Sequence, residues 1–257
     1  MPNGLALNRL FTSEKFMIDE NGGVIMRKFL ILMVIFLLVP NICLASLVMH
    51  FSFNGSCKNS VNGISGIHFG NHNYGKGLLN NAIYFDGDGD YIDLGTGYNL
   101  SKNFTMNVWV KTDVDNIKRE DAAILAKYET NEYGPYDFYL SYNCPAYWIS
   151  DGKGNYQKHI SNTKLRPNQW YMLTYTYDYA KSQLTIYING KYDTSFKCIP
   201  VTSNKDKVTI GRQALMFGDY SRLQYKGWID ELRLYDQTLS YERIKNLYRK
   251  YLMYSNM

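Results

Sequence analysis

Hydrophobic and polar residues alternate with a period of two along most of the chain after residue 46. This alternation is typical of β-strands that bury one face. The runs are short and end at turn sequences such as Asn-Gly and Asp-Gly. The expected strands are 48–53, 82–85, 91–94, 104–111, 123–127, 136–142, 146–150, 156–161, 170–177, 183–188, 207–211 and 227–236. So many short strands, with no strand–helix alternation, predict an all-β sandwich of antiparallel sheets.

Two local patterns add detail to this sandwich. The runs 82–85 and 91–94 flank Asp-Gly turns, which predicts a β-hairpin. Ser240 is a good N-cap, and the apolar residues after it recur at helical spacing. The stripe consists of Ile244, Leu247, Tyr248 and Tyr251. We therefore expect one short C-terminal helix, packed on the rim of the sandwich.

The stretch 227–236 combines a strand pattern with two acidic residues. Its alternation predicts one face with Trp228, Asp230, Leu232 and Leu234, and another with Ile229, Glu231, Arg233 and Tyr235. Neither face is wholly polar, so the strand should lie inside a layered structure. A carboxylate there needs a cation, a metal or backbone donors. Asp230 is therefore expected either to tie down a neighbouring loop or to ligate a structural metal.

The first 45 residues are predicted to lie outside the folded domain. Residues 26–28 are Met-Arg-Lys, and 29–39 form an apolar run too short to span a bilayer comfortably. Pro40 and the small residues that follow predict a signal peptide, 26–45, cleaved after Ala45. A lipoprotein signal at Cys43 is disfavoured by the bulky Ile42 before it. We expect a secreted, periplasmic or cell-surface protein with no membrane span in the mature chain.

Residues 1–25 precede a complete signal-peptide pattern, which is unusual. Gly22-Gly23 can be encoded as a ribosome-binding sequence, and two codons then separate it from Met26. We therefore expect 1–25 to be an untranslated upstream extension. An atypically long n-region is the alternative.

Composition and charge narrow the function classes. The 257 residues are 46% hydrophobic and 16% aromatic, which is sufficient for one large β domain, assigned to 46–257. The net charge of +5 comes from scattered Lys and Arg, which indicates solubility rather than nucleic-acid binding. The His residues are dispersed and no Cys-x-x-Cys occurs, which disfavours zinc and redox sites. Cys57, Cys144 and Cys198 allow at most one internal disulfide, and a leftover thiol would permit a covalent dimer.

Six sequence stretches occur in an order that carries a family resemblance. They are FDGDGDYIDL (85–94), FTMNVWVK (104–111), NQWYMLTYTYD (168–178), LTIYINGK (184–191), VTIGR (208–212) and GWIDELRLYDQTLS (227–240). Together they resemble the laminin-G-like, concanavalin A-like jelly-roll domain of exported bacterial and archaeal proteins. The resemblance covers about residues 47–250. It implies two curved antiparallel sheets in which the first and last strands lie together.

The resemblance also implies a structural calcium site, from which this sequence departs. Family members often combine two acidic residues of the opening loop with the late aspartate. Here Asn54 and Asn59 stand at the two loop positions, and Asp230 is the late aspartate. Calcium prefers several oxygens with enough negative charge among them. Two outcomes therefore stay open: weak calcium binding by Asp230, Asn54 and Asn59, or no metal.

Aromatic and amide side chains suggest a function in glycan recognition. Sugars are bound by flat aromatic faces and by hydrogen-bonding groups. One candidate set lies on strand faces that the core does not claim: Trp109, Asn107 and Tyr187. A second candidate platform, at the rim, consists of Tyr133, Tyr136, Tyr147 and Trp148. We expect an exported, non-catalytic carbohydrate-binding module, unless these aromatics are simply covered by a loop.

Two other function classes remain as alternatives. A glycoside hydrolase needs two carboxyls flanking one bond, and the Glu-x-Asp-x-x-Glu string of glucanases with this architecture does not occur. A polysaccharide lyase is disfavoured with it. The other alternative is a cell-surface adhesion or scaffold module that binds protein. The sequence separates it from glycan binding only by where the aromatic side chains emerge.

Overall fold

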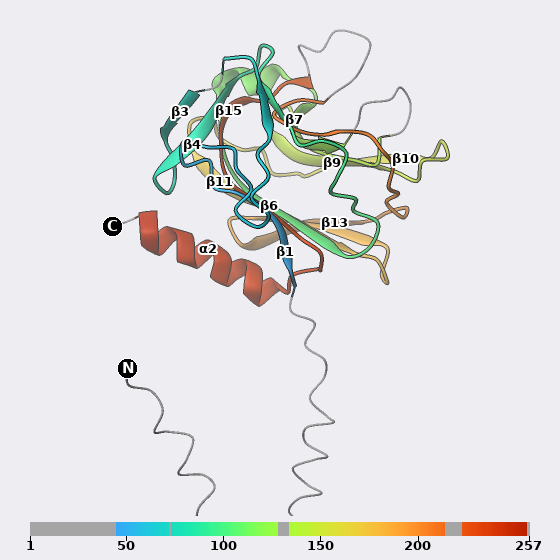
Figure 1. The fold of residues 1–257 in the computed structure, drawn as a ribbon. Coiled ribbons are helices and arrows are strands. Elements are labelled where there is room, and N and C mark those ends of the chain that lie inside the picture. Colours follow the sequence, from blue (N-terminus) through green and yellow to red (C-terminus); the bar gives the residue numbers. More distant parts are fainter. Residues whose placement is uncertain (1–44, 72, 128–133, 214–222, 256–257) are drawn as a thin grey trace, which may run out of the picture. The chain divides into compact units, whose positions relative to one another are not determined.

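The computed structural model describes residues 45–71, 73–127, 134–213 and 223–255. Two antiparallel β-sheets make up most of this part of the chain (Figure 1). The first sheet contains, in spatial order, β13 (Lys191–Lys197), β12 (Gln183–Ile188), β11 (Trp170–Asp178), β6 (Phe104–Thr112), β15 (Lys226–Tyr235), β4 (Asn81–Asp86) and β3 (Asn73–Lys76), and β1 (Leu47–Phe51) also pairs with β15. The second contains β10 (Tyr156–Ile160), β9 (Cys144–Ser150), β8 (Tyr136–Ser141), β7 (Ala122–Lys127), β14 (Val208–Ile210), β5 (Tyr91–Asp93) and β2 (Ile67–Phe69). A single 3-10 turn, η1 (Val114–Lys118), and helix α2 (Tyr241–Ser255) complete the described elements. The predicted all-β sandwich is confirmed.

The first and last strands lie side by side, as the family resemblance implies. β1 pairs antiparallel with the second half of β15, where His50 faces Arg233 and Phe51 faces Leu232. β4 pairs with the first half of β15, and β6 runs along its other edge. The two ends of the domain are therefore joined through β15.

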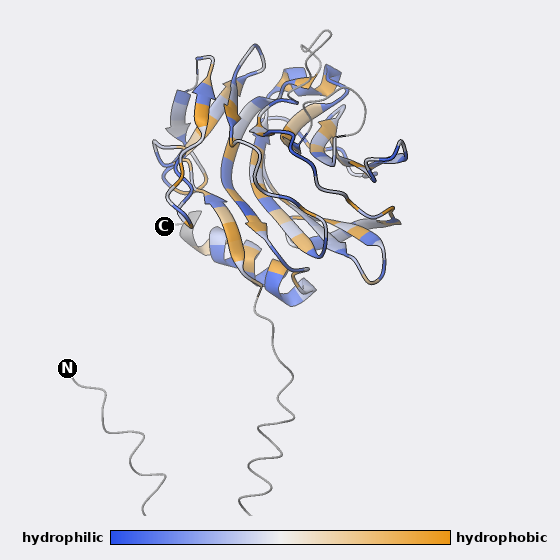
Figure 2. Cartoon of the chain, turned by 45° about the vertical axis from the view of Figure 1, so that its right-hand side comes forward, coloured by the Kyte–Doolittle hydropathy of each residue, from blue (hydrophilic) through white to orange (hydrophobic). Residues whose placement is uncertain are grey.

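The core lies between the two sheets and is rich in aromatic rings. Hydrophobic and hydrophilic residues alternate along the strands in Figure 2. Fully buried side chains from the first sheet, such as Tyr175, pack against those of the second, such as Phe138, with ring centroids 5.1 Å apart. Burial of such rings supplies the main driving force for folding, on the order of 2–3 kcal/mol each.

The hairpin predicted for 82–85 and 91–94 is wrong. β4 belongs to the first sheet and β5 to the second, so the segment between them crosses from one sheet to the other. The Asp90 carboxylate holds this crossing by accepting hydrogen bonds from the N–H of Asp86 at 3.0 Å and of Asn71 at 2.6 Å. Alternation predicts that two strands exist, but it does not predict which neighbours they pair with.

The strict alternation predicted for 227–236 is also wrong, because β15 contains a bulge. The pairing of β15 with β6 shifts between Asp230 and Arg233, and Glu231 has a left-handed φ of 51°. Ile229 and Leu232 consequently both point into the core. The two acids between them both lie on the opposite side, where Glu231 contacts α2 and Asp230 contacts the loop after β3.

Helix α2 begins after Ser240, as predicted. The Ser240 hydroxyl accepts from the N–H of Arg243 at 3.4 Å, and its carbonyl accepts from the N–H of Ile244 at 3.1 Å. The predicted apolar stripe forms one hydrophobic cluster with Trp109 of β6 and Met172 of β11. The helix therefore covers the face of the first sheet rather than the rim, because these two central strands present large apolar side chains there.

The predicted signal peptide and upstream extension lie outside the described residues, except Ala45. Cys43 and Tyr133 lie outside them as well. Among the helices of the described part, none has the length and apolar character needed to cross a membrane.

Candidate functional site

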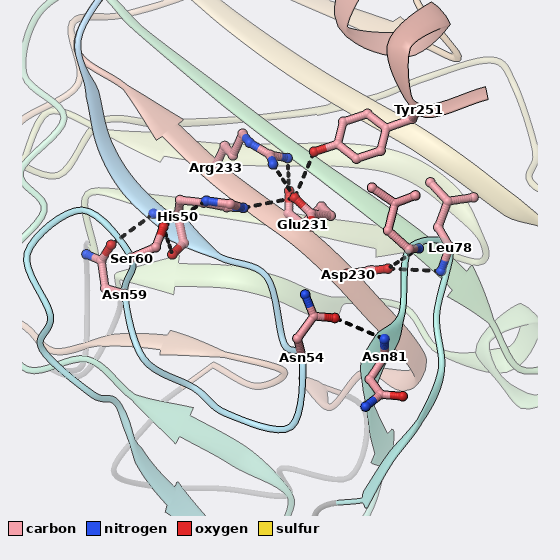
Figure 3. Close-up of polar contacts among 11 residues, drawn as sticks. His50, Asn54, Asn59, Ser60, Leu78, Asn81, Asp230, Glu231, Arg233 and Tyr251 are labelled. Atoms are coloured by element: carbon pink, nitrogen blue, oxygen red, sulfur yellow. Dashed lines mark hydrogen bonds and ion pairs between the residues drawn. The ribbon is translucent and has the colours of Figure 1, made fainter. Parts of the chain in front are cut away.

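Asp230 is fully buried and acts as an anchor for the loop after β3. Its Oδ2 accepts from the N–H of Leu78 at 2.9 Å and of Leu79 at 3.4 Å (Figure 3). A Cβ on Gly77 would lie 2.7 Å from the same oxygen, so only glycine permits this approach. Burial, helped by the charge of Glu231, raises the pKa of Asp230 to about 7. The loop-tying interpretation of Asp230 fits these contacts.

The residues predicted to share calcium with Asp230 point their oxygens at N–H groups instead. Asn54 Oδ1 accepts from the N–H of Asn81 at 3.0 Å. Asn59 Oδ1 accepts from the N–H of His50 at 3.1 Å and of Val61 at 3.0 Å. No cluster of three or more His, Cys, Asp or Glu side chains suited to a metal occurs within the described ranges. Since each of the three side chains holds a different backbone segment through these hydrogen bonds, they do not fit a shared calcium site.

Glu231 is the centre of a buried polar cluster that joins β1, β15 and α2. Its Oε2 lies 2.8 Å from His50 Nε2, accepts from the Tyr251 hydroxyl at 2.7 Å, and pairs with the guanidinium of Arg233 (Figure 3). Burial alone would raise the pKa of Glu231. The hydrogen bonds from His50 and Tyr251 and the charge of Arg233 outweigh it and hold the pKa below its usual value.

Ser60 extends this cluster to the surface. Its Oγ lies 2.9 Å from His50 Nδ1, and the opposite ring nitrogen faces Glu231. The carboxylate favours the tautomer with the proton on Nε2, which leaves Nδ1 to accept from the serine hydroxyl. Serine, imidazole and carboxylate thus follow the hydrogen-bond order of an acyl-transfer triad. The sequence did not reveal this series of hydrogen bonds, because Ser60 and Glu231 are distant in sequence. His50 connects them only because β1 pairs with β15.

The first predicted glycan-binding set is covered by helix α2. Trp109 is 1% exposed and stacks against Tyr248 of the helix, with ring centroids 5.7 Å apart. Asn107 is fully buried and donates to Thr174 Oγ1 at 2.7 Å. Tyr187 is half-buried beneath Tyr241, with ring centroids 6.2 Å apart. Trp109 and Tyr187 attach the helix to the sheet, whereas Asn107 bonds within the sheet, so the three side chains present no open aromatic surface.

The second predicted platform is split between the two faces of its sheet. Tyr136 and Tyr147 are fully buried in the core, where their hydroxyls lie 2.7 Å from the Tyr98 carbonyl and 3.0 Å from Cys198 Sγ, respectively. Trp148, the next residue after Tyr147, points to the outer face and is half-buried. Among the described members of this predicted platform, only Trp148 therefore reaches the surface.

Trp148 belongs to a larger group on the outer face of the second sheet, which we call the aromatic face: Tyr139, Trp148, Tyr156, Lys158 and Asp137. The rings of Trp148 and Tyr156 stack with centroids 5.7 Å apart, and Tyr156 is 59% exposed. Lys158 lies opposite Trp148 in the strand register, with its Nζ 5.4 Å from the Tyr139 ring centroid. The same ammonium pairs with Asp121 at 2.8 Å.

Asp137 supplies a carboxyl in the same row of side chains. Asp137, on β8, lies opposite Trp148 on β9 and opposite Ala126 on β7. Its Oδ2 accepts from the side-chain amide of Gln213, and its Oδ1 has no hydrogen-bond partner within the described residues. Burial raises the pKa of Asp137 well above its ordinary value. Because Asp137 is fully buried, the groups of the aromatic face that a sugar could contact are the stacked rings and Lys158.

The three cysteines of the described domain are free thiols. Cys57 and Cys198 are buried and Cys144 is half-buried. Burial raises the pKa of each thiol. Since these thiols are poor nucleophiles, a cysteine-based active site finds no support here.

A family model described as the concanavalin A-like lectin/glucanases superfamily matches residues 86–245. The chain belongs to this superfamily. The matched segment runs from the end of β4 into α2, and so includes the aromatic face and the Glu231 bulge. Among curated protein sequences no match was found.

Solved structures show the same fold at low sequence identity. Domain 4 of AbnA, a GH43 extracellular arabinanase from Geobacillus stearothermophilus in complex with arabinotriose, aligns with a TM-score of 0.64 and 20% identity, covering 79% of this chain and 98% of that one. The binding domain of Paraclostridial Mosquitocidal Protein 1 aligns with a TM-score of 0.65 and 17% identity, covering 80% of this chain and 52% of that one. The botulinum neurotoxin serotype D binding domain aligns with a TM-score of 0.63 and 18% identity, with coverages of 80% and 52%. The chain therefore spans about half the length of the toxin domains.

Proposed function

We propose that this chain is an exported, non-catalytic module that binds a polysaccharide or glycoconjugate through the aromatic face. The stacked pair Trp148 and Tyr156 carries the proposal, because it presents aromatic surface beside polar groups on an outer sheet face. The arabinanase domain, which is similar in fold over nearly its whole length, was solved with arabinotriose. The two toxin domains are binding domains. These likenesses support a role in binding.

The aromatic face offers a sugar both kinds of contact. The Trp148 and Tyr156 rings supply a surface against which the C–H face of a pyranose or furanose ring can pack. Lys158, which is exposed, can donate to ring or hydroxyl oxygens of the sugar. Loss of one stacking ring should weaken binding by roughly 1–3 kcal/mol, from lost apolar burial and ring contact.

A glycan array on the exported protein, followed by titration calorimetry on the best ligand, tests the proposal. We expect Trp148→Ala and Tyr156→Ala each to weaken binding about 5- to 150-fold, which corresponds to the same energy range. Tyr179→Ala is the matched control, since Tyr179 is 51% exposed on the turn between β11 and β12. Affinity unchanged in both aromatic-face variants would contradict the proposed surface. Absence of any glycan ligand would favour the adhesion or scaffold alternative.

Hydrolysis is a second candidate function, and one observation favours it. The Ser60–His50–Glu231 chain has the order of donors and acceptors that activates a serine nucleophile. A fluorophosphonate probe and short-chain nitrophenyl esters test it, with Ser60→Ala as the variant. Under the binding proposal, neither labelling of Ser60 nor ester turnover is expected. Labelling of Ser60 that is lost in His50→Gln would instead establish an acyl-transfer site.

A further inference from the structure

Ser46 and Asp236 hold each other by two hydrogen bonds at the start of the domain. The backbone nitrogen of Ser46 donates to Asp236 Oδ1 at 2.8 Å. In return, the backbone nitrogen of Asp236 donates to the Ser46 carbonyl at 3.1 Å. Both residues are exposed, and Leu47 directly afterwards pairs with Tyr235 in the β1–β15 ladder. The nitrogen of Ser46 is therefore held beside a carboxylate at the protein surface.

This contact coincides with the predicted cleavage point of the signal peptide. The small residue Ala45 precedes Ser46, and the compact unit of the structure begins at Ala45. Signal peptidases act on the chain during export, before the domain folds. The nitrogen that donates to Asp236 is thus the one that cleavage would free.

We propose that removal of the signal peptide creates an ion pair between the new α-ammonium of Ser46 and the carboxylate of Asp236. Water adds to the Ala45 carbonyl as the Ala45–Ser46 bond breaks. The carboxylate leaves with Ala45, and the Ser46 nitrogen becomes an ammonium group at neutral pH. This group keeps the position of the former amide nitrogen. A hydrogen bond from an uncharged amide to the carboxylate is thereby replaced by one between two opposite charges.

Of the charged groups near this ammonium, Asp236 is the one that can pair with it. Arg243 of α2 donates to the Ala45 carbonyl at 3.4 Å, a contact that cleavage removes, and its guanidinium also lies 5.7 Å from the Tyr235 ring centroid. Further along β15, Glu231 is already paired with Arg233. The positive charge of Arg243 opposes the ammonium, while Asp236, in direct hydrogen-bond contact, favours it.

The ion pair gives a specific pH dependence. A free α-amine has a pKa of about 7.7–8.0, and pairing with a carboxylate raises it in the folded state. Its stabilising contribution is therefore fully present below the unfolded-state pKa and is lost as the pH rises through the folded-state pKa. The effect falls in a window between about pH 8 and 9, where few other side chains titrate.

The experiment uses the full chain expressed in an exporting bacterium. The intact mass of the exported protein should correspond to a chain that begins at Ser46. Thermal melts of the wild type and of Asp236→Asn are then compared from pH 6 to 9.5. Asparagine keeps the hydrogen-bond acceptor and removes only the charge. We expect the variant to melt about 1–3 °C lower near pH 6.5, and the difference to disappear by about pH 9.5.

Asp178→Asn is the matched control. Asp178 pairs with Lys181 at 2.8 Å on the surface, and this pairing raises the pKa of the lysine above its ordinary value. The small effect of that substitution should therefore persist to pH 9.5. A mass that corresponds to another first residue, or to an uncleaved chain, would overturn the proposal. So would an Asp236→Asn difference that stays constant with pH, because no titrating ammonium would then take part in the contact.

Discussion

Tyr251 donates a hydrogen bond of 2.7 Å to Glu231, which connects the last helix to the bulge in the last strand. The same tyrosine ring packs edge-on against Trp109, with centroids 5.6 Å apart. Tyr251 of α2 therefore belongs both to the polar cluster around Glu231 and to the hydrophobic cluster beneath the helix. The domain thus uses its C-terminal helix as part of its structural framework, with both an apolar and a charged attachment.

Tyr251→Phe should lower the free energy of unfolding by about 1–2 kcal/mol. The substitution keeps the ring but removes a donor to a buried carboxylate. Urea denaturation measures the loss. Tyr248→Phe is the control, because it keeps the ring that stacks on Trp109 and is only half-buried. Equal losses of unfolding free energy in the two variants would show that the hydrogen bond to Glu231 adds no stability of its own.

Trp109→Phe should reduce stability without reducing glycan affinity. The smaller ring leaves a gap beneath α2, with an expected cost of roughly 1–3 kcal/mol. Because Trp109 is buried, no ligand reaches it in the folded protein. Denaturation and calorimetry on the same sample separate the two effects. Loss of affinity with unchanged stability would instead indicate that Trp109 contacts the glycan.

Asp230→Asn should remove part of the pH dependence of stability. The pKa of Asp230 is raised to about 7 in the folded protein from an ordinary value of 3.8. The folded state therefore favours the protonated carboxyl, and the contribution of Asp230 to stability falls as the pH rises from about 4 to about 7. Asparagine does not titrate, so the variant should gain stability relative to wild type over this window. Denaturation at several pH values measures the difference; a constant difference would contradict the burial argument.

Calcium and chelator should leave the melting temperature unchanged. A ligand that binds only the folded state raises the melting temperature by mass action. The oxygens of Asn54 and Asn59 are already hydrogen-bonded to backbone N–H groups. Thermal melts with added calcium and with chelator test the point. A calcium-dependent rise that Asp230→Ala abolishes would reinstate the metal site.

The sequence by itself determined the fold class and most of the strands. It also determined where α2 begins in the chain, because Ser240 and the residues after it form a local helix signal that needs no distant partner. The family resemblance added the adjacency of β1 and β15. Each of these features depends on periodicity over a few residues or on motifs in a fixed order.

Only the tertiary structure decided the features that depend on contacts between distant residues. Alternation predicted the outward face of Trp109 but not that α2 would cover it, because that contact depends on a distant part of the chain. The left-handed backbone at Glu231 broke the alternation, since a bulge is set by strand pairing rather than by composition. It turned Glu231 toward His50, which lies 181 positions away in the chain. Burial and partnership, which govern site chemistry, are therefore properties of the packed domain.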